Sequence, residues 1–158
     1  LFRSRFFYFL CSLAVFLSCN PMNFYEKSKP IPNHKWKSKM TVNDSFSITD
    51  TTTLYNIYVI LRHTDAYKYN NIWLETGLQA PGDSLFFQKM NIPLSDDATG
   101  WYGSGMDDIW EVRSKLSDRP RKFSKPGTYK YVLKQLMRDD PLPEVMSVGL
   151  RVEKVPYQ

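Results

Sequence analysis

The chain has 158 residues and a formal net charge of +5, and 42% of its residues are hydrophobic, with tyrosine and phenylalanine each present ten times. This length indicates one domain with a core of its own, and the aromatic-rich composition favours strands. The charge is ordinary for a soluble surface. Both cysteines fall within the first 19 residues, which excludes a disulfide or a thiolate metal site in the rest of the chain.

Residues 1–18 have the order of an export signal. Arg3 and Arg5 precede an apolar run over residues 6–17, which ends just before Cys19. The run has twelve residues, fewer than the roughly 20 that cross a bilayer, so a permanent transmembrane helix is not expected. A cysteine at this point is typical of bacterial lipoprotein signals, in which the sulfur receives diacylglycerol and the chain is cut before it. The alternative is that Cys19 is merely a small apolar residue late in the run.

Lipidation of Cys19 determines where the protein is expected to work. Two or three acyl chains on one residue hold a protein to a membrane with negligible release. We therefore expect a water-soluble body that is tethered to a membrane of the cell envelope and faces the periplasm. This compartment excludes nucleic acid as a partner.

Residues 19–40 are predicted to be the lipidated cysteine followed by a short tether. The segment is polar, contains several prolines and lysines, and shows no period of 2 or 3.6. It is interpreted either as a tether or as an extended edge segment that Tyr25 and Trp36 dock onto the body. The folded domain is then expected over residues 41–158.

Residues 41–158 show the pattern of strands. In the first predicted strand Val42, Phe46 and Ile48 share one face, which is a period of two. Residues 54–62 are apolar on both faces, so this strand is expected at the centre of a sheet. Strands at hairpin spacing without a long amphipathic helix predict an all-β fold, an antiparallel β-sandwich of the jelly-roll or immunoglobulin-like type. The predicted strands cover residues 42–48, 54–62, 72–79, 84–92, 109–116, 128–137 and 146–153.

A glycine-rich loop over residues 93–105 carries the most distinctive polar and aromatic side chains. Aspartate pairs at positions 96–97 and 107–108 flank a tryptophan and a tyrosine. Carboxylates suit calcium, and exposed aromatic rings can stack on a sugar. The alternative is a loop of solvated charges. The spacing of the aspartates matches no EF-hand, and adjacent aspartates in an extended chain point apart. We therefore assign no metal site. The candidate ligand-binding residues are Trp101, Tyr102, Asp107 and Asp108.

The sequence offers no catalytic set. His34 and His63 are the only imidazoles; neither has metal-ligand spacing, and both are expected in loops. Ser104 lies between glycines but lacks the strand-to-helix context of a nucleophile elbow. Two of the aspartates would serve a glycosidase only if a cleft held them at a fixed separation. We therefore expect that the protein is not an enzyme.

Residues 118–125 are predicted to form a basic loop. Arg119, Arg121 and Lys122 stand close together in it. Such a cluster can contact anionic lipid headgroups or an acidic partner. The commoner explanation is a solvated surface loop.

Several short runs stand in a characteristic order along the chain. They are Gly100-Trp101-Tyr102-Gly103-Ser104-Gly105 leading into Asp107-Asp108-Ile109, Pro126-Gly127-Thr128-Tyr129, Gln135-Leu136-Met137-Arg138 and Val148-Gly149-Leu150-Arg151-Val152-Glu153-Lys154. Together with the signal that ends at Cys19, their order and spacing resemble the gliding motility lipoprotein GldH family of Bacteroidota. The resemblance spans nearly the whole chain.

This resemblance implies a non-enzymatic, lipid-anchored envelope component that acts with other gliding motility or type IX secretion proteins. It brings no catalytic residue, no cofactor and no small-molecule substrate, and it assigns a role to Cys19 alone, as the lipidation site. The alternative hypothesis is an envelope carbohydrate-binding module that uses Trp101 and Tyr102, with or without calcium.

Overall fold

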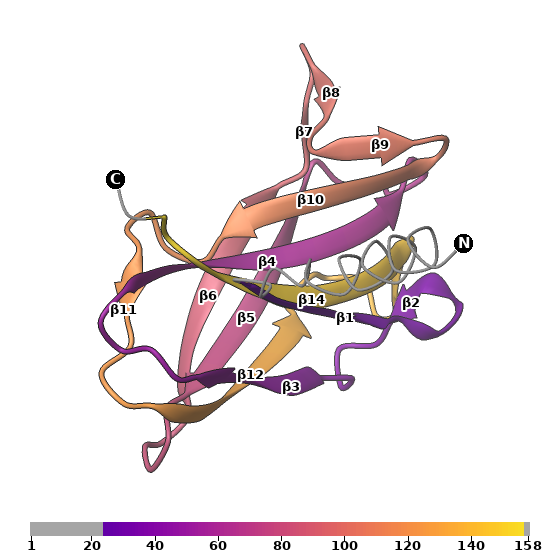
Figure 1. Ribbon diagram of the computed structural model, residues 1–158. Coiled ribbons are helices and arrows are strands. Elements are labelled where there is room, and N and C mark those ends of the chain that lie inside the picture. The colour runs from indigo at the N-terminus through magenta and orange to yellow at the C-terminus, as the bar shows by residue number, and fades with distance from the viewer. Residues whose placement is uncertain (1–23, 157–158) are drawn as a thin grey trace, which may run out of the picture.

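The protein is an all-β sandwich of antiparallel sheets, as the sequence predicted (Figure 1). The structure is a computed structural model that describes residues 24–156, so the predicted signal at residues 1–18 and the lipidation site Cys19 lie outside the described residues. No helix within residues 24–156 is long and apolar enough to cross a membrane. The strands are β1 (Phe24–Pro30), β2 (Lys35–Trp36), β3 (Val42–Ile48), β4 (Leu54–Thr64), β5 (Asn71–Gln79), β6 (Phe86–Pro93), β7 (Ser95–Asp96), β8 (Gly100–Trp101), β9 (Ser104–Met106), β10 (Ile109–Lys115), β11 (Arg121–Lys122), β12 (Gly127–Gln135), β13 (Leu142–Pro143) and β14 (Val145–Lys154).

The larger sheet is built around β4. Its strand order is β1-β14-β4-β10-β9, and β11 also pairs with β4. Val59, Ile60 and Leu61 on β4 are each at most 1% exposed, although their side chains alternate between the two faces of the sheet. The central position predicted from the two-sided apolar pattern is therefore confirmed.

The smaller sheet has the order β3-β12-β5-β6 and contributes Phe46, Tyr129 and Tyr131 to the aromatic core. Phe46 on β3 stands opposite Tyr129 on β12, and the two buried rings stack with centroids 5.6 Å apart. Phe123 packs edge-on against Tyr129 at 4.7 Å. Aromatic pairs in these geometries stabilise a core beyond the area that they bury. The core thus lies between the two sheets, where aromatic and aliphatic side chains interdigitate.

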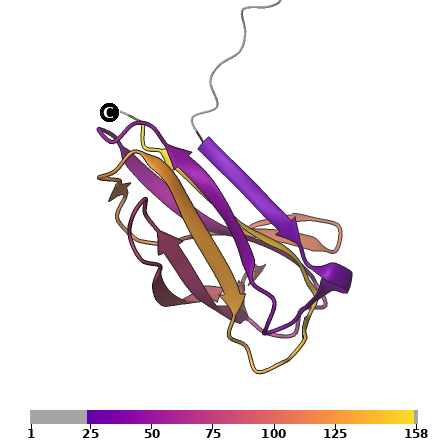
Figure 2. The ribbon, with the colours of Figure 1, turned by 90° about the horizontal axis from the view of Figure 1, so that it is seen from below.

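The segment that was predicted as a tether belongs to the sandwich from Phe24 onward. β1 pairs with β14 along its whole length, beginning with Phe24 opposite Glu153, and it lies at the edge of the sandwich in Figure 2. Trp36 in β2 is fully buried, and its indole N–H donates to the carbonyl of Met40 at 2.9 Å. Of the two interpretations of this segment, the structure therefore has the extended edge segment, and the strands of the sandwich begin at Phe24.

Two other expectations differ from the structure. His63 is not in a loop: it lies in β4, and its side chain is fully buried. The loop predicted over residues 93–105 contains the β7–β8 hairpin and the start of β9, which pairs with β10. Strands of two or three residues are too short to show an alternating pattern in the sequence.

The path of β4 defines two ends of the sandwich. β4 begins where Leu54 pairs with Lys122 of β11, close to the end of β14, and it finishes where Thr64 pairs with Ile109 of β10. β4 has 11 residues, and at about 3.3 Å per residue its ends lie about 30 Å apart. The first end, here termed the basal end, comprises Phe24, Leu54, residues 80–86 and residues 119–122. The second, here termed the tip, comprises residues 95–108.

Candidate functional site

The candidate ligand-binding residues lie on the tip, where the chain leaves β6 and forms the β7–β8 hairpin (Figure 1). Leu94 at the foot of the hairpin is fully buried, and its N–H donates to the carbonyl of Asn70 at 2.7 Å. The carbonyl of Leu94 accepts the N–H of Tyr102 at 2.7 Å. Both sides of the hairpin are therefore fixed to the body.

Asp96 holds the turn of this hairpin closed. One carboxylate oxygen accepts the N–H groups of Ala98 and Thr99 at 2.8 and 2.6 Å, and the other accepts the hydroxyl of Tyr102 at 2.6 Å. The Tyr102 hydroxyl and the turn N–H groups favour the charged carboxylate, so they lower the pKa of Asp96 to about 2. Tyr102 is thus occupied by a structural hydrogen bond, and its pKa is raised by the same carboxylate.

Trp101 fastens the hairpin to the larger sheet. Its indole lies against the imidazole of His63, with ring centroids 4.6 Å apart, and near the ring of Tyr67 at 6.4 Å. Tyr67 and His63 are both buried, and their rings are 5.5 Å apart. The indole of Trp101 is itself partly buried, so much of the ring that the sequence offered for sugar stacking is used in this aromatic cluster.

His63 is the buried polar centre of this cluster. Its Nδ1 donates to the carbonyl of Thr64 at 2.8 Å, whereas its Nε2 has no hydrogen-bond partner among the described residues. Burial disfavours the charged ring and lowers the pKa of His63 below its ordinary value of 6.5. The imidazole is therefore neutral at pH 7 and acts as a packing partner of Trp101 and Tyr67.

Asp107 and Asp108 form the turn between β9 and β10, and both are exposed. Asp107 has a left-handed backbone conformation with a φ of 56°, which aspartate tolerates better than most residues. The carbonyl of Asp108 accepts the N–H of Asp65 at 2.8 Å, which ties this turn to the end of β4. Met106 beside them is 75% exposed. The turn therefore presents two carboxylates and an apolar thioether to solvent on a fixed backbone.

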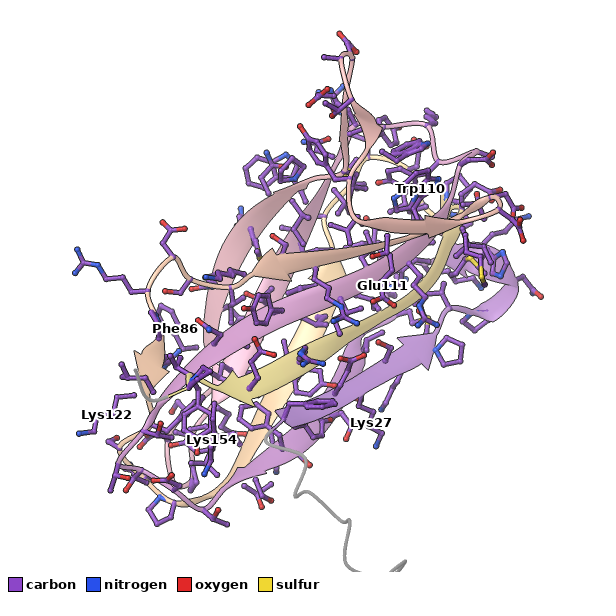
Figure 3. The ribbon with its side chains drawn as sticks, turned by 45° about the horizontal axis from the view of Figure 1, so that its top comes forward. Lys27, Phe86, Trp110, Glu111, Lys122 and Lys154 are labelled. Carbon is purple, nitrogen blue, oxygen red and sulfur yellow. The ribbon has the colours of Figure 1, made fainter. Side chains whose placement is uncertain are left out.

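Glycine at position 103 is required by the close approach of β10. Gly103 has a φ of +92°, and a Cβ there would lie 2.0 Å from the carbonyl oxygen of Glu111. A Cβ at Gly105 would lie 2.7 Å from the ring of Trp110, which covers it. Figure 3 labels Trp110 and Glu111 on the strand that supports the tip. The Gly-rich run is thus explained by packing of the tip on β10.

The tip brings some of the predicted residues together and leaves others apart. Trp101 and Tyr102 are both used within the hairpin, whereas Asp107 and Asp108 stand on a separate turn. Within residues 24–156 no three side chains of His, Asp or Glu are grouped closely enough to hold a metal ion. The arrangement suits a contact surface with a fixed backbone. The exposed thioether of Met106 on this backbone can adapt to the surface of a partner.

The sequence interpretation missed that His63 and Tyr67 pack against Trp101 of the tip. The signal for His63 was present, because it continues the alternating inward series Val59 and Leu61 of β4. The signal for Tyr67 was weak, because it lies in a short polar connection between two strands.

Comparison with known proteins identifies the family of this chain. The family described as GldH lipoprotein matches residues 23–152. The chain is 28% identical to "Gliding motility lipoprotein GldH homolog" of Christiangramia forsetii, over 96% of this chain and 98% of that protein. It is 25% identical to "Gliding motility lipoprotein GldH" of Flavobacterium johnsoniae, over 92% of this chain and 93% of that protein.

Among solved structures, the VP2 subviral particle of infectious bursal disease virus is 14% identical over 83% of this chain and 30% of that chain. Its TM-score of 0.31 is too low to indicate a shared fold. The match of the family over most of the chain agrees with the order of motifs found in the sequence. This protein is a member of the GldH lipoprotein family.

Proposed function

We propose that this protein is a lipid-anchored component of the gliding motility machinery, and that it works by contact with other gliding or type IX secretion proteins and not by catalysis. Family membership supports the first part, because two relatives that align over nearly their whole length are named as gliding motility lipoproteins. The second part rests on the construction of the tip.

We assign the anchor to Cys19, whose acyl chains would insert into the membrane. Four residues separate Cys19 from Phe24, the first residue of β1. A lipid on this cysteine would hold the sandwich close to the membrane, with its body in the periplasm. In cells grown with labelled fatty acid, a Cys19→Ser chain should carry no label and should accumulate as the uncut precursor.

The single observation that supports a contact role is the rigidity of the exposed tip. Asp96 closes the β7–β8 turn through three hydrogen bonds, and Trp101 packs the hairpin on His63. A surface whose shape is fixed before binding loses little conformational entropy when a partner docks. Met106 and Asp108 supply exposed apolar and acidic groups on the separate β9–β10 turn, which the hydrogen bond from the N–H of Asp65 to the carbonyl of Asp108 holds in place. Such a mixture is typical of protein contact surfaces.

The proposal is tested by complementing a strain that lacks the gene. The wild-type chain should restore gliding, whereas Cys19→Ser and the double variant Met106→Glu/Asp108→Lys should not. A matched control is Ser47→Glu, which places a new charge on an exposed position of β3 away from the tip. Gliding and secretion that persist without the gene would contradict the assignment to the machinery. Full gliding with the tip variant would contradict the role of the tip.

A glycan array distinguishes the carbohydrate-binding alternative from the contact role. The alternative requires that the wild-type chain binds a glycan and that Trp101→Ala loses this binding while it retains the fold. Absence of glycan binding together with loss of gliding in the tip variant supports the contact role.

A further inference from the structure

The start of β1 lies at the basal end of the sandwich. Phe24 pairs with Glu153, and the next residue of β14, Lys154, pairs with Tyr55 near the start of β4. The β5–β6 turn reaches the same end, because Asp83 forms an ion pair with Lys125 at 2.6 Å. Figure 3 shows Phe86, Lys122 and Lys154 together at this end, with Trp110 at the other. The chain therefore enters the fold about 30 Å from the tip.

Three large apolar side chains are exposed at the basal end. Phe86 at the start of β6 is 69% exposed, Leu54 at the start of β4 is 44% exposed, and Phe24 is 38% exposed. They come from three different strands and lie at the ends of those strands. Exposed apolar groups that gather at one end of a body with a polar rim mark an interaction surface.

The same end has cations that form no ion pair with a residue that the structure describes. Asp50 and Asp83 are paired with Lys154 and Lys125. Exposed Arg119, Arg121 and Lys122 form no salt bridge with any residue in the range 24–156. One carboxylate, that of Asp118, precedes these three cations. Basic side chains beside exposed aromatic and aliphatic groups match the surface of an anionic bilayer.

The length of chain before β1 fixes how far this end can stand from the anchor. Four residues lie between Cys19 and Phe24, so five residue-to-residue steps join the two positions. A fully extended chain covers at most about 3.4 Å per residue, so Phe24 lies within about 17 Å of an acylated cysteine. The tip cannot reach the membrane on this tether without tilting the body, whereas the basal end can. The exposed apolar and basic groups and the short segment before β1 therefore both favour the basal end as the side that faces the membrane.

We propose that the basal end lies on the surface of an anionic phospholipid bilayer. Arg119, Arg121 and Lys122 contact lipid phosphates, and Phe86 enters the boundary between headgroups and acyl chains. Arg119 and Arg121 also line a groove of about 320 Å³ at this end, which is open to a headgroup. This docking orients the tip away from the membrane. The inference rests on the proposed lipidation of Cys19, because the anchor selects which end meets the bilayer.

The test uses the mature lipidated chain in vesicles of phosphatidylcholine with phosphatidylglycerol. The acylated Cys19 is blocked, so a second cysteine can be labelled selectively with a fluorophore. Ser84→Cys reports on the basal end and Ser104→Cys on the tip, since both serines are exposed. Quenching by nitroxide lipids should be at least about threefold stronger for the label at position 84.

Charge removal separates docking from tethering. Arg119→Gln/Arg121→Gln/Lys122→Gln should lower the quenching at position 84 toward that at position 104, as should vesicles of phosphatidylcholine alone. The matched control, Lys35→Gln/Lys37→Gln/Lys39→Gln, removes three exposed cations far from the basal end and should leave the quenching unchanged. Equal quenching at positions 84 and 104 would overturn docking. Quenching at position 84 that is unchanged in Arg119→Gln/Arg121→Gln/Lys122→Gln would also overturn it. Mass spectrometry reports acylation separately, so a chain without lipid refutes the anchor and not this surface.

Discussion

The indole of Trp101 lies 4.6 Å from the imidazole of His63, and this contact joins the tip to the central strand of the larger sheet. Trp101 comes from a two-residue strand at the edge of the molecule, whereas His63 is fully buried in β4. The shape of the tip is therefore coupled to the stability of the core.

Replacing Trp101 should destabilise the whole domain. A Trp101→Ala chain loses the ring contacts with His63 and Tyr67, and for a partly buried aromatic ring we expect a loss of about 2 kcal/mol in the free energy of unfolding. Trp73→Ala is the matched control, because Trp73 is 43% exposed, and its loss should be under about 1 kcal/mol. Urea unfolding measures both values. Equal losses would show that Trp101 does not fasten the tip.

His63 should make stability fall in mild acid. Because burial lowers the pKa of His63 in the folded state below 6.5, the unfolded chain binds a proton first as the pH falls. The contribution of the neutral ring is complete above pH 6.5, and it is lost progressively as the pH falls below 6.5 toward the folded pKa. His63→Phe should remove this part of the pH dependence, and His34→Gln, at an exposed position, should retain it. Unfolding curves between pH 7.5 and pH 5 test this, and an unchanged slope in His63→Phe would refute it.

Asp96 should protect the tip at neutral pH and lose this effect in acid. Its pKa is lowered from 3.8 to about 2 by the hydroxyl of Tyr102 and the turn N–H groups, so its contribution is present above pH 3.8 and is lost as the pH falls toward 2. Asp96→Asn should speed hydrogen exchange of the Ala98 and Thr99 amides. Asp97→Asn is the neighbouring control. Similar exchange rates in the two variants would mean that Asp96 does not close the turn.

Gly103 should tolerate no side chain. Gly103→Ala places a Cβ 2.0 Å from the carbonyl oxygen of Glu111 and forces a φ of +92° on alanine, so we expect a loss of roughly 3 kcal/mol in unfolding free energy. Gly82 also has a positive φ, but no atom lies within 4 Å of its Cβ position. Gly82→Ala should therefore lose only about 1 kcal/mol. Thermal unfolding of both chains separates the clash from the backbone strain.

The sequence predicted β3, β4, β5, β12 and β14 well, because each has a buried face and so shows apolar positions at a period of two. β6 is exposed over most of its length, and the turn before it gave the signal. The apolar pattern also placed the centre of the larger sheet at residues 54–62, and β4 is found there. For β1 the sequence left open a tether or an extended edge segment, because only Tyr25 and Lys29 among its residues are partly buried. A polar strand whose contribution is mainly backbone pairing with β14 leaves no hydrophobic period to detect.

The sequence grouped the candidate residues only by their proximity along the chain. In the structure Trp101 and Tyr102 belong to the β7–β8 hairpin, whereas Asp107 and Asp108 form the separate turn between β9 and β10. Sequence spacing cannot reveal that Tyr102 donates to Asp96 or that Trp101 packs on His63, because these contacts depend on how the hairpin folds back on β4. Two glycines of this loop, Gly103 and Gly105, are places of close approach between β10 and the tip.

Site-specific photocrosslinking in living cells tests most directly whether the tip contacts the gliding machinery. A photoreactive amino acid at position 106 replaces the exposed side chain of Met106, and the same residue at position 47 replaces exposed Ser47 on the outer face of β3. We expect position 106 to capture gliding or type IX secretion proteins, identified by mass spectrometry, and position 47 to capture none of them. Capture of these proteins from position 47 alone, or of no such protein from position 106, would contradict the account.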